Sequence, residues 1–221
     1  MSGTGAASDV IGAVLAGGRG RRIGGDKPSI ELGGRTLARR AVDAVRMTGL
    51  DVALVLRPHQ PVPLTARTVE VVRDELEDAG PLGGLQALLR RLPSEWALVV
   101  PCDQPFLAPD LLRGLLDQPR EDVDVVVGWL VTWLQPLPGL YRRTCLPFVE
   151  RALARGERSL RELLDALRLR EVSETDLRQW DPQMLSYVNV NTPADLARAR
   201  ALVASAGRER RELQKVLSQR R

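Results

Sequence analysis

The chain has 221 residues, of which 44% are hydrophobic, and this suits one large α/β domain or two small ones. No run of 18 apolar residues occurs, which argues against a membrane span, and the first ten residues lack the basic and apolar segments of a signal peptide. The net charge of +4 equals that of the tail from Gly207 onward, where six basic residues outnumber two acidic ones, so the rest is neutral. We therefore expect a cytoplasmic protein that binds neither a membrane nor nucleic acid.

Three residue types are scarce enough to argue against whole classes of site. His59 is the only histidine, which disfavours histidine-rich metal sites and Ser-His-Asp catalysis, and we expect it at the surface. Cys102 and Cys145 are the only cysteines, so no disulfide framework is expected. Only Lys27 and Lys215 among 32 basic residues are lysines. A lysine in so arginine-rich a chain suggests use of its compact ammonium as a point charge on a phosphate.

Short apolar runs alternate with helical patterns along the chain. Apolar residues at helical spacing predict helices that contain residues 37–45, 85–92 and 160–167. The apolar runs predict strands at Ile11–Leu15, Val52–Leu56, Val69–Val72, Ala97–Val100, Val123–Val127 and Tyr187–Val190. This alternation predicts an α/β fold with three layers, in which helices cover both faces of a doubly wound, mostly parallel sheet.

A last helix is expected to open at Thr192-Pro193-Ala194-Asp195. Thr192 suits the N-cap, Pro193 suits the first turn, and Asp195 favours the positive end of the helix. No linker interrupts the chain before this point. We assign residues 9–206 to one domain and residues 207–221 to a basic C-terminal extension.

A glycine-rich loop from Leu15 to Lys27 follows the first predicted strand, with the sequence Leu-Ala-Gly-Gly-Arg-Gly-Arg-Arg-Ile-Gly-Gly-Asp-Lys. Ligands of open α/β sheets bind beyond the carboxyl ends of the strands, where this loop lies. Glycines let backbone N–H groups approach a phosphate, and Arg19, Arg22 and Lys27 add positive charge suited to a triphosphate. The alternative is a flexible surface loop with solvated arginines.

Two better-known phosphate loops do not fit this segment. A Walker A loop needs glycine directly before its lysine and serine or threonine directly after it, but Lys27 stands between Asp26 and Pro28. The dinucleotide fingerprint fails because Ile23 occupies the place of its third glycine. The loop is therefore of another kind.

Asp103 follows the strand predicted at Ala97–Val100, beside the glycine-rich loop. A carboxylate at this place is well suited to hold Mg²⁺, which takes one or two carboxylates and completes its shell with water and phosphate oxygens. The alternative is that Asp103 forms a turn or caps the helix expected at Pro109.

Two further polar segments lie at predicted strand ends. Asp74 follows Val69–Val72, and the segment from Gly80 to Gly84 opens the next helix, whose N-terminus favours negative charge. An ordinary Pro-Gly turn explains that segment equally well. Asn189 and Asn191 lie at the end of the late strand, where their side chains either reach a metal-bound phosphate or a second substrate, or only form a turn.

These segments together resemble a known family. The pattern from Leu15 to Lys27 is similar to the opening signature of the sugar-phosphate-type nucleotidyltransferases, and within that superfamily it most resembles the molybdenum cofactor guanylyltransferases. The resemblance covers about residues 10–200. Pro-Cys-Asp-Gln-Pro around Asp103 matches the metal-binding motif of the family, and residues 189–193 match its Asn-x-Asn-Thr-Pro motif on the acceptor side.

The resemblance implies a nucleotide-diphospho-sugar transferase-like fold and a role for each matched residue. Arg22, Lys27 and Asp103 are the expected catalytic residues, with Mg²⁺ on Asp103. Gln135, Asn189 and Asn191 are expected to bind the acceptor. Nucleotide contacts are expected from Leu15, Ala16, Gly17, Gly18, Lys27, Asp74, Gly80, Gly83 and Asp103.

Three features depart from the family pattern. The glycine-rich loop is one residue shorter between Gly25 and Asp26 than is common. Val55 stands where an asparagine near the base is usual, which leaves the identity of the base open. The segment Trp129–Leu134 is apolar where a polar turn is expected, and it either covers a flat pterin or packs against the core or another subunit.

The resulting hypothesis is transfer of GMP from GTP to the terminal phosphate of molybdopterin carrying molybdenum, with release of pyrophosphate. Such chemistry needs positioning and charge neutralisation more than a protein nucleophile. The resemblance also suggests molybdenum cofactor insertion proteins or molybdoenzyme chaperones as partners. The alternatives are a sister transferase that uses CTP or another acceptor, a nucleotide-binding module without catalysis, and a nucleic-acid protein that acts through the tail.

Overall fold

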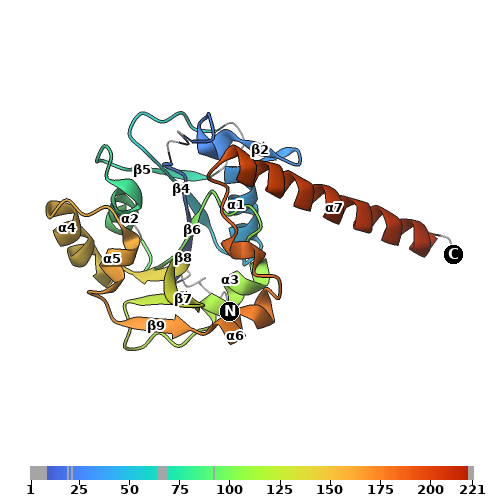
Figure 1. Ribbon diagram of the computed structural model, residues 1–221. Coiled ribbons are helices and arrows are strands. Elements are labelled where there is room, and N and C mark those ends of the chain that lie inside the picture. Colours follow the sequence, from blue (N-terminus) through green and yellow to red (C-terminus); the bar gives the residue numbers. More distant parts are fainter. Residues whose placement is uncertain (1–8, 19, 21, 64–68, 92, 219–221) are drawn as a thin grey trace, which may run out of the picture.

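The computed structural model describes residues 9–18, 20, 22–63, 69–91 and 93–218, with side chains up to residue 208. A seven-stranded sheet forms its centre, in the order β5-β4-β1-β6-β8-β7-β9 (Figure 1). Only β8 runs antiparallel to its neighbours among these strands, which confirms the expected mostly parallel sheet. The strands are β1 (Val10–Leu15), β4 (Val52–Leu56), β5 (Glu70–Arg73), β6 (Trp96–Pro101), β7 (Val125–Leu130), β8 (Trp133–Arg142) and β9 (Leu169–Val172).

Helices cover both faces of the sheet, as expected for a doubly wound fold (Figure 1). Side chains alternate along each strand, so Val14 and Leu54 pack on one face while Ala13 and Val55 pack on the other. The first face is covered by α1 (Leu37–Arg46), α3 (Pro109–Leu116) and α6 (Glu174–Trp180). The second face is covered by α2 (Gly80–Arg91), α4 (Leu146–Ala154) and α5 (Leu160–Leu164).

The last helix, α7 (Pro193–Ser218), begins where its capping signal predicted. The Thr192 hydroxyl accepts a hydrogen bond from the Asp195 N–H at 3.1 Å, and the Asp195 carboxylate accepts one from the Thr192 N–H at 2.9 Å. Its first turns pack on a small cluster beside the ribbon of β2 (Glu31–Leu32) and β3 (Arg35–Thr36), and the helix then projects from the body (Figure 1). It continues through residue 207, where the basic extension was expected to start.

Several sequence-based boundaries were wrong. Residues 187–190 form no strand, because Leu185–Tyr187 is a 3₁₀ turn and the Val190 N–H bonds to the Asp103 carbonyl at 2.8 Å instead of to a ladder. The third predicted helix ends at Leu164 instead of reaching residue 167. The strand expected at residues 123–127 is shifted to 125–130. Strands β8 and β9 were not expected at all, and Leu92 lies outside the described residues.

The apolar segment Trp129–Leu134 forms the tip of a hairpin between β7 and β8. Val131 occupies the turn with a positive φ of 53°, and Trp129, Val131 and Trp133 are 38%, 77% and 48% exposed. These three side chains are therefore not packed into the core of the chain.

Among the described residues, no helix is long and apolar enough to cross a membrane.

Candidate functional site

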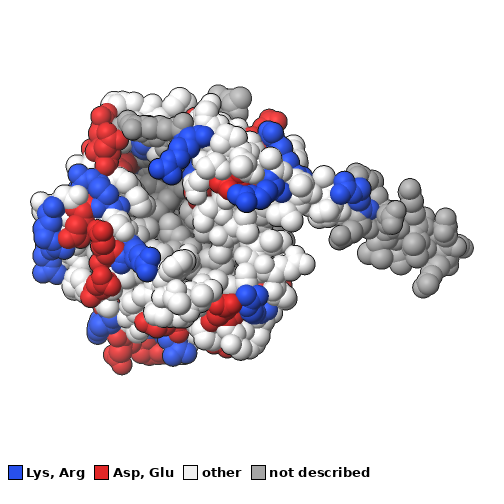
Figure 2. Space-filling model, in the orientation of Figure 1, with Lys and Arg blue, Asp and Glu red and all other residues white. Residues whose placement is uncertain are grey.

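A cavity of about 770 Å³ opens at the carboxyl edge of the sheet. Strands β1, β4 and β6 run parallel and end together there, so their last residues Leu15, Leu56 and Pro101 all line the cavity. Figure 2 shows a hollow in this face of the molecule, with basic side chains, drawn blue, at its margin. This edge is where ligands bind in open α/β sheets.

The glycine-rich loop forms one wall of the cavity. Leu15, Gly17 and Gly18 line it directly, while Ala16 is fully buried behind them. A Cβ on Gly17 would lie 3.0 Å from the Arg57 side chain, which would have to shift to make room for it. At Gly17 and Gly18, which have no side chains, the loop therefore presents backbone to the cavity, as a phosphate site needs.

The middle of the loop is held by a tight turn. Gly20 has a φ of +57°, and a Cβ there would overlap the Gly25 carbonyl, so glycine is required at this position. Arg22, expected to be catalytic, is exposed and is not among the residues that line the cavity. Its role stays a prediction, and Arg19 lies outside the described residues.

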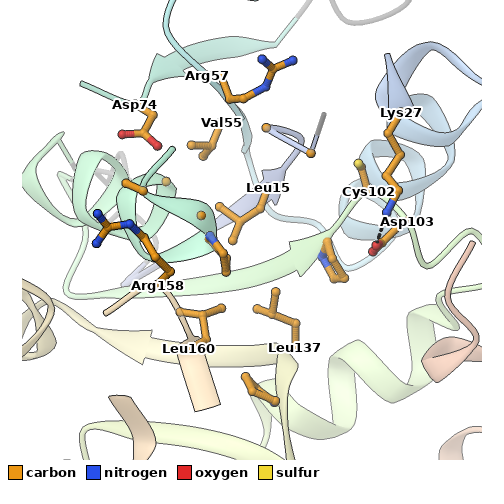
Figure 3. A pocket seen from close by; sticks show the side chains of 18 of the residues that line it. Leu15, Lys27, Val55, Arg57, Asp74, Cys102, Asp103, Leu137, Arg158 and Leu160 are labelled. Carbon is orange, nitrogen blue, oxygen red and sulfur yellow. Dashed lines mark hydrogen bonds and ion pairs between the residues drawn. The ribbon is translucent and has the colours of Figure 1, made fainter. Parts of the chain in front are cut away.

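The Lys27 ammonium stands at the centre of the predicted site. It donates to the Asp103 carboxylate at 2.7 Å (Figure 3). It also donates to the Asn191 side-chain oxygen at 2.6 Å. These partners are 76 and 164 positions away in the sequence, and the side chains of Lys27 and Asp103 are only 11% and 19% exposed. The fold thus gathers three predicted residues into one polar cluster beside the glycine-rich loop.

Three different elements supply this cluster. Lys27 begins the 3₁₀ turn Lys27–Ser29, Asp103 follows the end of β6, and Asn191 precedes α7. The bond from the Val190 N–H to the Asp103 carbonyl fixes the last two segments side by side. Asn191 does not line the cavity itself, and it is joined to the site through its hydrogen bond with Lys27.

Asp74 and the start of α2 form the opposite end of the cavity (Figure 3). Burial raises the pKa of the Asp74 carboxyl, against the opposing effect of its bonds to nearby backbone N–H groups. Gly83 does not line the cavity, but a Cβ there would overlap the Asp74 carboxylate. Gly80 lines the cavity and has a φ of +63°, so both glycines serve the geometry of this end.

The residues expected on the acceptor side lie on a third wall. Gln135, on β8, and Asn189 both line the cavity. Leu137 lies beside them, and its carbonyl accepts a hydrogen bond from the buried Gln104 amide at 3.4 Å. The antiparallel strand β8, which was not expected from the sequence, is what brings Gln135 to this wall.

Three arginines in the cavity wall were missed by the sequence analysis. Arg57 follows β4, and the end of a predicted strand was a signal for it. Arg158 and Arg161 flank the start of α5, and no motif marks them. The Arg158 guanidinium donates to the backbone carbonyls of Asp78 and Glu157 at 3.0 and 2.8 Å.

Gln60 was also missed, although it ties the glycine-rich loop to the segment after β4. Its side chain is buried, with 3% of the residue exposed. The amide nitrogen donates to the Ala16 carbonyl at 3.1 Å and to the Asp26 carboxylate at 2.9 Å. The amide oxygen accepts from the Arg57 N–H at 3.1 Å. One side chain therefore joins both ends of the loop.

Asp103 is the carboxylate best placed to hold a metal ion. Among the described residues, no group of three or more His, Cys, Asp and Glu side chains gathers at a metal-binding distance. A single carboxylate beside a phosphate site fits Mg²⁺, which draws its other ligands from phosphate and water.

Burial raises the pKa of the neighbouring Cys102 thiol, which disfavours its reactive thiolate form. His59 is exposed, as expected.

The chain is similar in sequence and in structure to known nucleotidyltransferases. Residues 12–172 fit the model of the MobA-like NTP transferase domain. The chain is 33% identical to the molybdenum cofactor guanylyltransferase of Desulfosudis oleivorans, over 90% of this chain and 98% of that one. It is 31% identical to the same enzyme of Vibrio cholerae, over 88% and 93%. The structure resembles molybdopterin-guanine dinucleotide biosynthesis protein A from Archaeoglobus fulgidus, with a TM-score of 0.78, 28% identity and coverage of 88% and 98%.

Proposed function

The chain belongs to the MobA-like NTP transferase domain family, and we propose that it transfers GMP from GTP to the terminal phosphate of molybdopterin carrying molybdenum. The products are molybdopterin guanine dinucleotide and pyrophosphate. The reaction forms a bond between an acceptor phosphate oxygen and the α-phosphorus of GTP, and it breaks the bond from the α-phosphorus to the bridging oxygen.

The observation that carries this proposal is the position of Lys27 between Asp103 and Asn191, beside the glycine-rich loop. In our proposal the backbone of Gly17 and Gly18 binds the triphosphate, and the Lys27 ammonium neutralises charge on the leaving pyrophosphate. Asn191 orients that ammonium. Such a site catalyses by positioning and charge, without a nucleophile of its own.

We further propose that Asp103 holds Mg²⁺ when the nucleotide binds. The ion would neutralise charge on the phosphate oxygens during transfer. Lys27 then exchanges its contact with Asp103 for contacts with phosphate. Asn189 and Gln135 bind the acceptor on the adjoining wall, and Asp74 accepts hydrogen bonds from hydroxyl or N–H groups of the nucleotide.

The test compares Lys27→Ala and Asp103→Asn proteins with the wild type in pyrophosphate release from GTP and the molybdenum-loaded acceptor. We expect each variant to lose at least about a hundredfold in turnover, as when a positioned charge is removed from a transition state. The matched control is Asp110→Asn, because this exposed carboxylate pairs with Arg113 on the surface of α3. Near-normal turnover by either site variant, with a normal control, would overturn the assigned role.

Val55 favours a second candidate, a transferase that uses CTP. The family's usual asparagine would offer hydrogen bonds to the base, whereas Val55 presents an apolar side chain to the cavity. Thermal shifts with GTP and CTP separate the two, because a specific ligand stabilises the protein according to its own affinity. A larger rise in melting temperature with CTP than with GTP would identify CTP as the donor. Nucleotide binding without pyrophosphate release would indicate a nucleotide-binding module without catalysis.

The remaining parts of the proposal concern the surroundings of the enzyme. We infer a cytoplasmic location, because both cysteines are free, as is usual in a reducing compartment. The product needs to reach the proteins that use it, so cofactor insertion proteins or molybdoenzyme chaperones are the expected partners. Co-purification with a tagged chain tests this inference.

A further inference from the structure

Arg161 is a cation in the cavity wall that the proposed mechanism leaves without a role. It lines the cavity from α5, and no hydrogen bond or ion pair engages its guanidinium within the described part of the chain. Of the other two cavity arginines, Arg158 donates to two carbonyls, and Arg57 lies 3.6 Å from the Asp26 carboxylate. Arg161 is thus the cavity arginine with neither a hydrogen bond nor an ion pair among the described residues.

The Arg161 side chain is braced by an aromatic ring. Its guanidinium carbon lies 5.6 Å from the centroid of the Trp133 ring, at the start of β8. Trp133 is 48% exposed, so the indole is not a core residue, and its face is free to support a cation. Bracing reduces the number of rotamers that Arg161 gives up when it binds an anion.

Trp133 braces Arg161 from beside the acceptor wall, without lining the cavity itself. Trp133 and Gln135 are two residues apart on β8, so their side chains project from the same face of the strand. The neighbours of Arg161 in the chain, Arg158 and Leu160, lie across the cavity from Lys27 (Figure 3). The triphosphate site and Arg161 are thus on different walls.

From this arrangement we propose that Arg161, braced by Trp133, binds an anionic oxygen group of the acceptor and sets the affinity for acceptors of that charge. The proposal rests on the proposed function, because it concerns the second substrate of the same reaction. A guanidinium forms paired hydrogen bonds with phosphate-like groups, which a solvated ammonium does not match.

The experiment measures KM for GTP and for molybdenum-loaded molybdopterin in Arg161→Ala, Arg161→Lys, Trp133→Ala and Trp133→Phe proteins. We expect Arg161→Ala to raise KM for the acceptor about tenfold, which is about 1.4 kcal/mol of binding free energy, and to leave KM for GTP unchanged. Trp133→Ala should raise the same KM by a smaller factor. Trp133→Phe should restore it, because a phenyl ring also supports the guanidinium.

The matched control is Arg151→Ala. Arg151 stacks on Phe148 in the same way, 4.6 Å from its centroid, but this pair is on α4 and neither residue lines the cavity. We expect the control to change neither KM. A general effect on folding would lower the melting temperature of the Arg161 and Trp133 variants without separating the two substrates.

Two failures are distinguishable. If the wild type releases no pyrophosphate with this acceptor, the proposed function is overturned and the assignment of Arg161 with it. If the wild type turns over and Arg161→Ala keeps the wild-type KM for the acceptor, only the assignment of Arg161 is overturned. An equal rise in the KM for GTP would also contradict it, because Arg161 would then serve the donor.

Discussion

Replacement of Gln60 tests whether the glycine-rich loop is held in shape by a single buried amide. In Gln60→Ala, the Ala16 carbonyl and the Arg57 N–H lose their bonds of 3.1 Å, and the Asp26 carboxylate loses one of 2.9 Å. Each buried group left unpaired costs about 1–3 kcal/mol. Asp26 keeps contact with water, so the two backbone groups dominate, and we expect a loss of about 2–6 kcal/mol in the free energy of unfolding.

The assay is urea denaturation, followed by GTP titration of the folded protein. Because both ends of the loop lose their tie, we expect GTP affinity to fall by about tenfold or more, equivalent to at least ~1.4 kcal/mol. Gln60→Glu sharpens the test, because it keeps the shape but places a second carboxylate beside Asp26. It should be at least as damaging near neutral pH as Gln60→Ala.

A buried glutamine elsewhere provides the control. Gln86 lies within α2, is 6% exposed and does not line the cavity, so Gln86→Ala should leave GTP affinity unchanged. The reasoning is refuted if Gln60→Ala loses less than about 1 kcal/mol, the low end for one buried unpaired group. It is also refuted if stability falls while GTP affinity matches that of the control.

Three further predictions concern packing, pH and metal. Gly114→Ala should lower the free energy of unfolding by about 1–3 kcal/mol in denaturation, because its Cβ would overlap the Trp180 ring. This overlap outweighs the roughly 1 kcal/mol by which alanine stabilises a helix relative to glycine. A gain in stability would contradict the prediction. The hydrogen bond from the Thr192 hydroxyl is the first cause that lowers the pKa of Asp195 to about 2. The wild type should therefore be more stable than Asp195→Asn by its full margin above about pH 4, and this margin should shrink as pH falls toward 2. A margin that stays constant over that range would contradict the prediction. Chelation of divalent metal should stop pyrophosphate release, and added Mg²⁺ should restore it. Asp103→Asn should need a far higher Mg²⁺ concentration for the same rate. An unaltered Mg²⁺ dependence in that variant would show that Asp103 is not the metal ligand.

Much of the site was predictable because its residues follow strands. Leu15 ends an apolar run, Asp74 and Asp103 follow one within three residues, and parallel strands bring their carboxyl ends to one edge. The glycine-rich loop carried its own signal in its composition. Lys27 and Asn191 were expected at the site from the loop and from the family resemblance, but their mutual contact was not.

The rest depended on contacts that no local pattern records. Strand β8 alternates poorly and contains two prolines, so its place between β6 and β7 comes from pairing with neighbours on both sides. Gln60 has no motif around it, and only the approach of the segment after β4 to the loop gives its amide three partners. Arg161 likewise becomes a cavity residue because α5 packs beside β8.

By itself the sequence determined the alternation of strands and helices, the cap of the last helix and the chemistry of the loop between Leu15 and Lys27. These properties follow from hydrophobic period and from the backbone freedom of glycine, which act over a few residues. The tertiary structure decided which arginines line the cavity. Arg22 stands outside the cavity while Arg57, Arg158 and Arg161 line it, because the direction of a long side chain is set by neighbours far away in the chain.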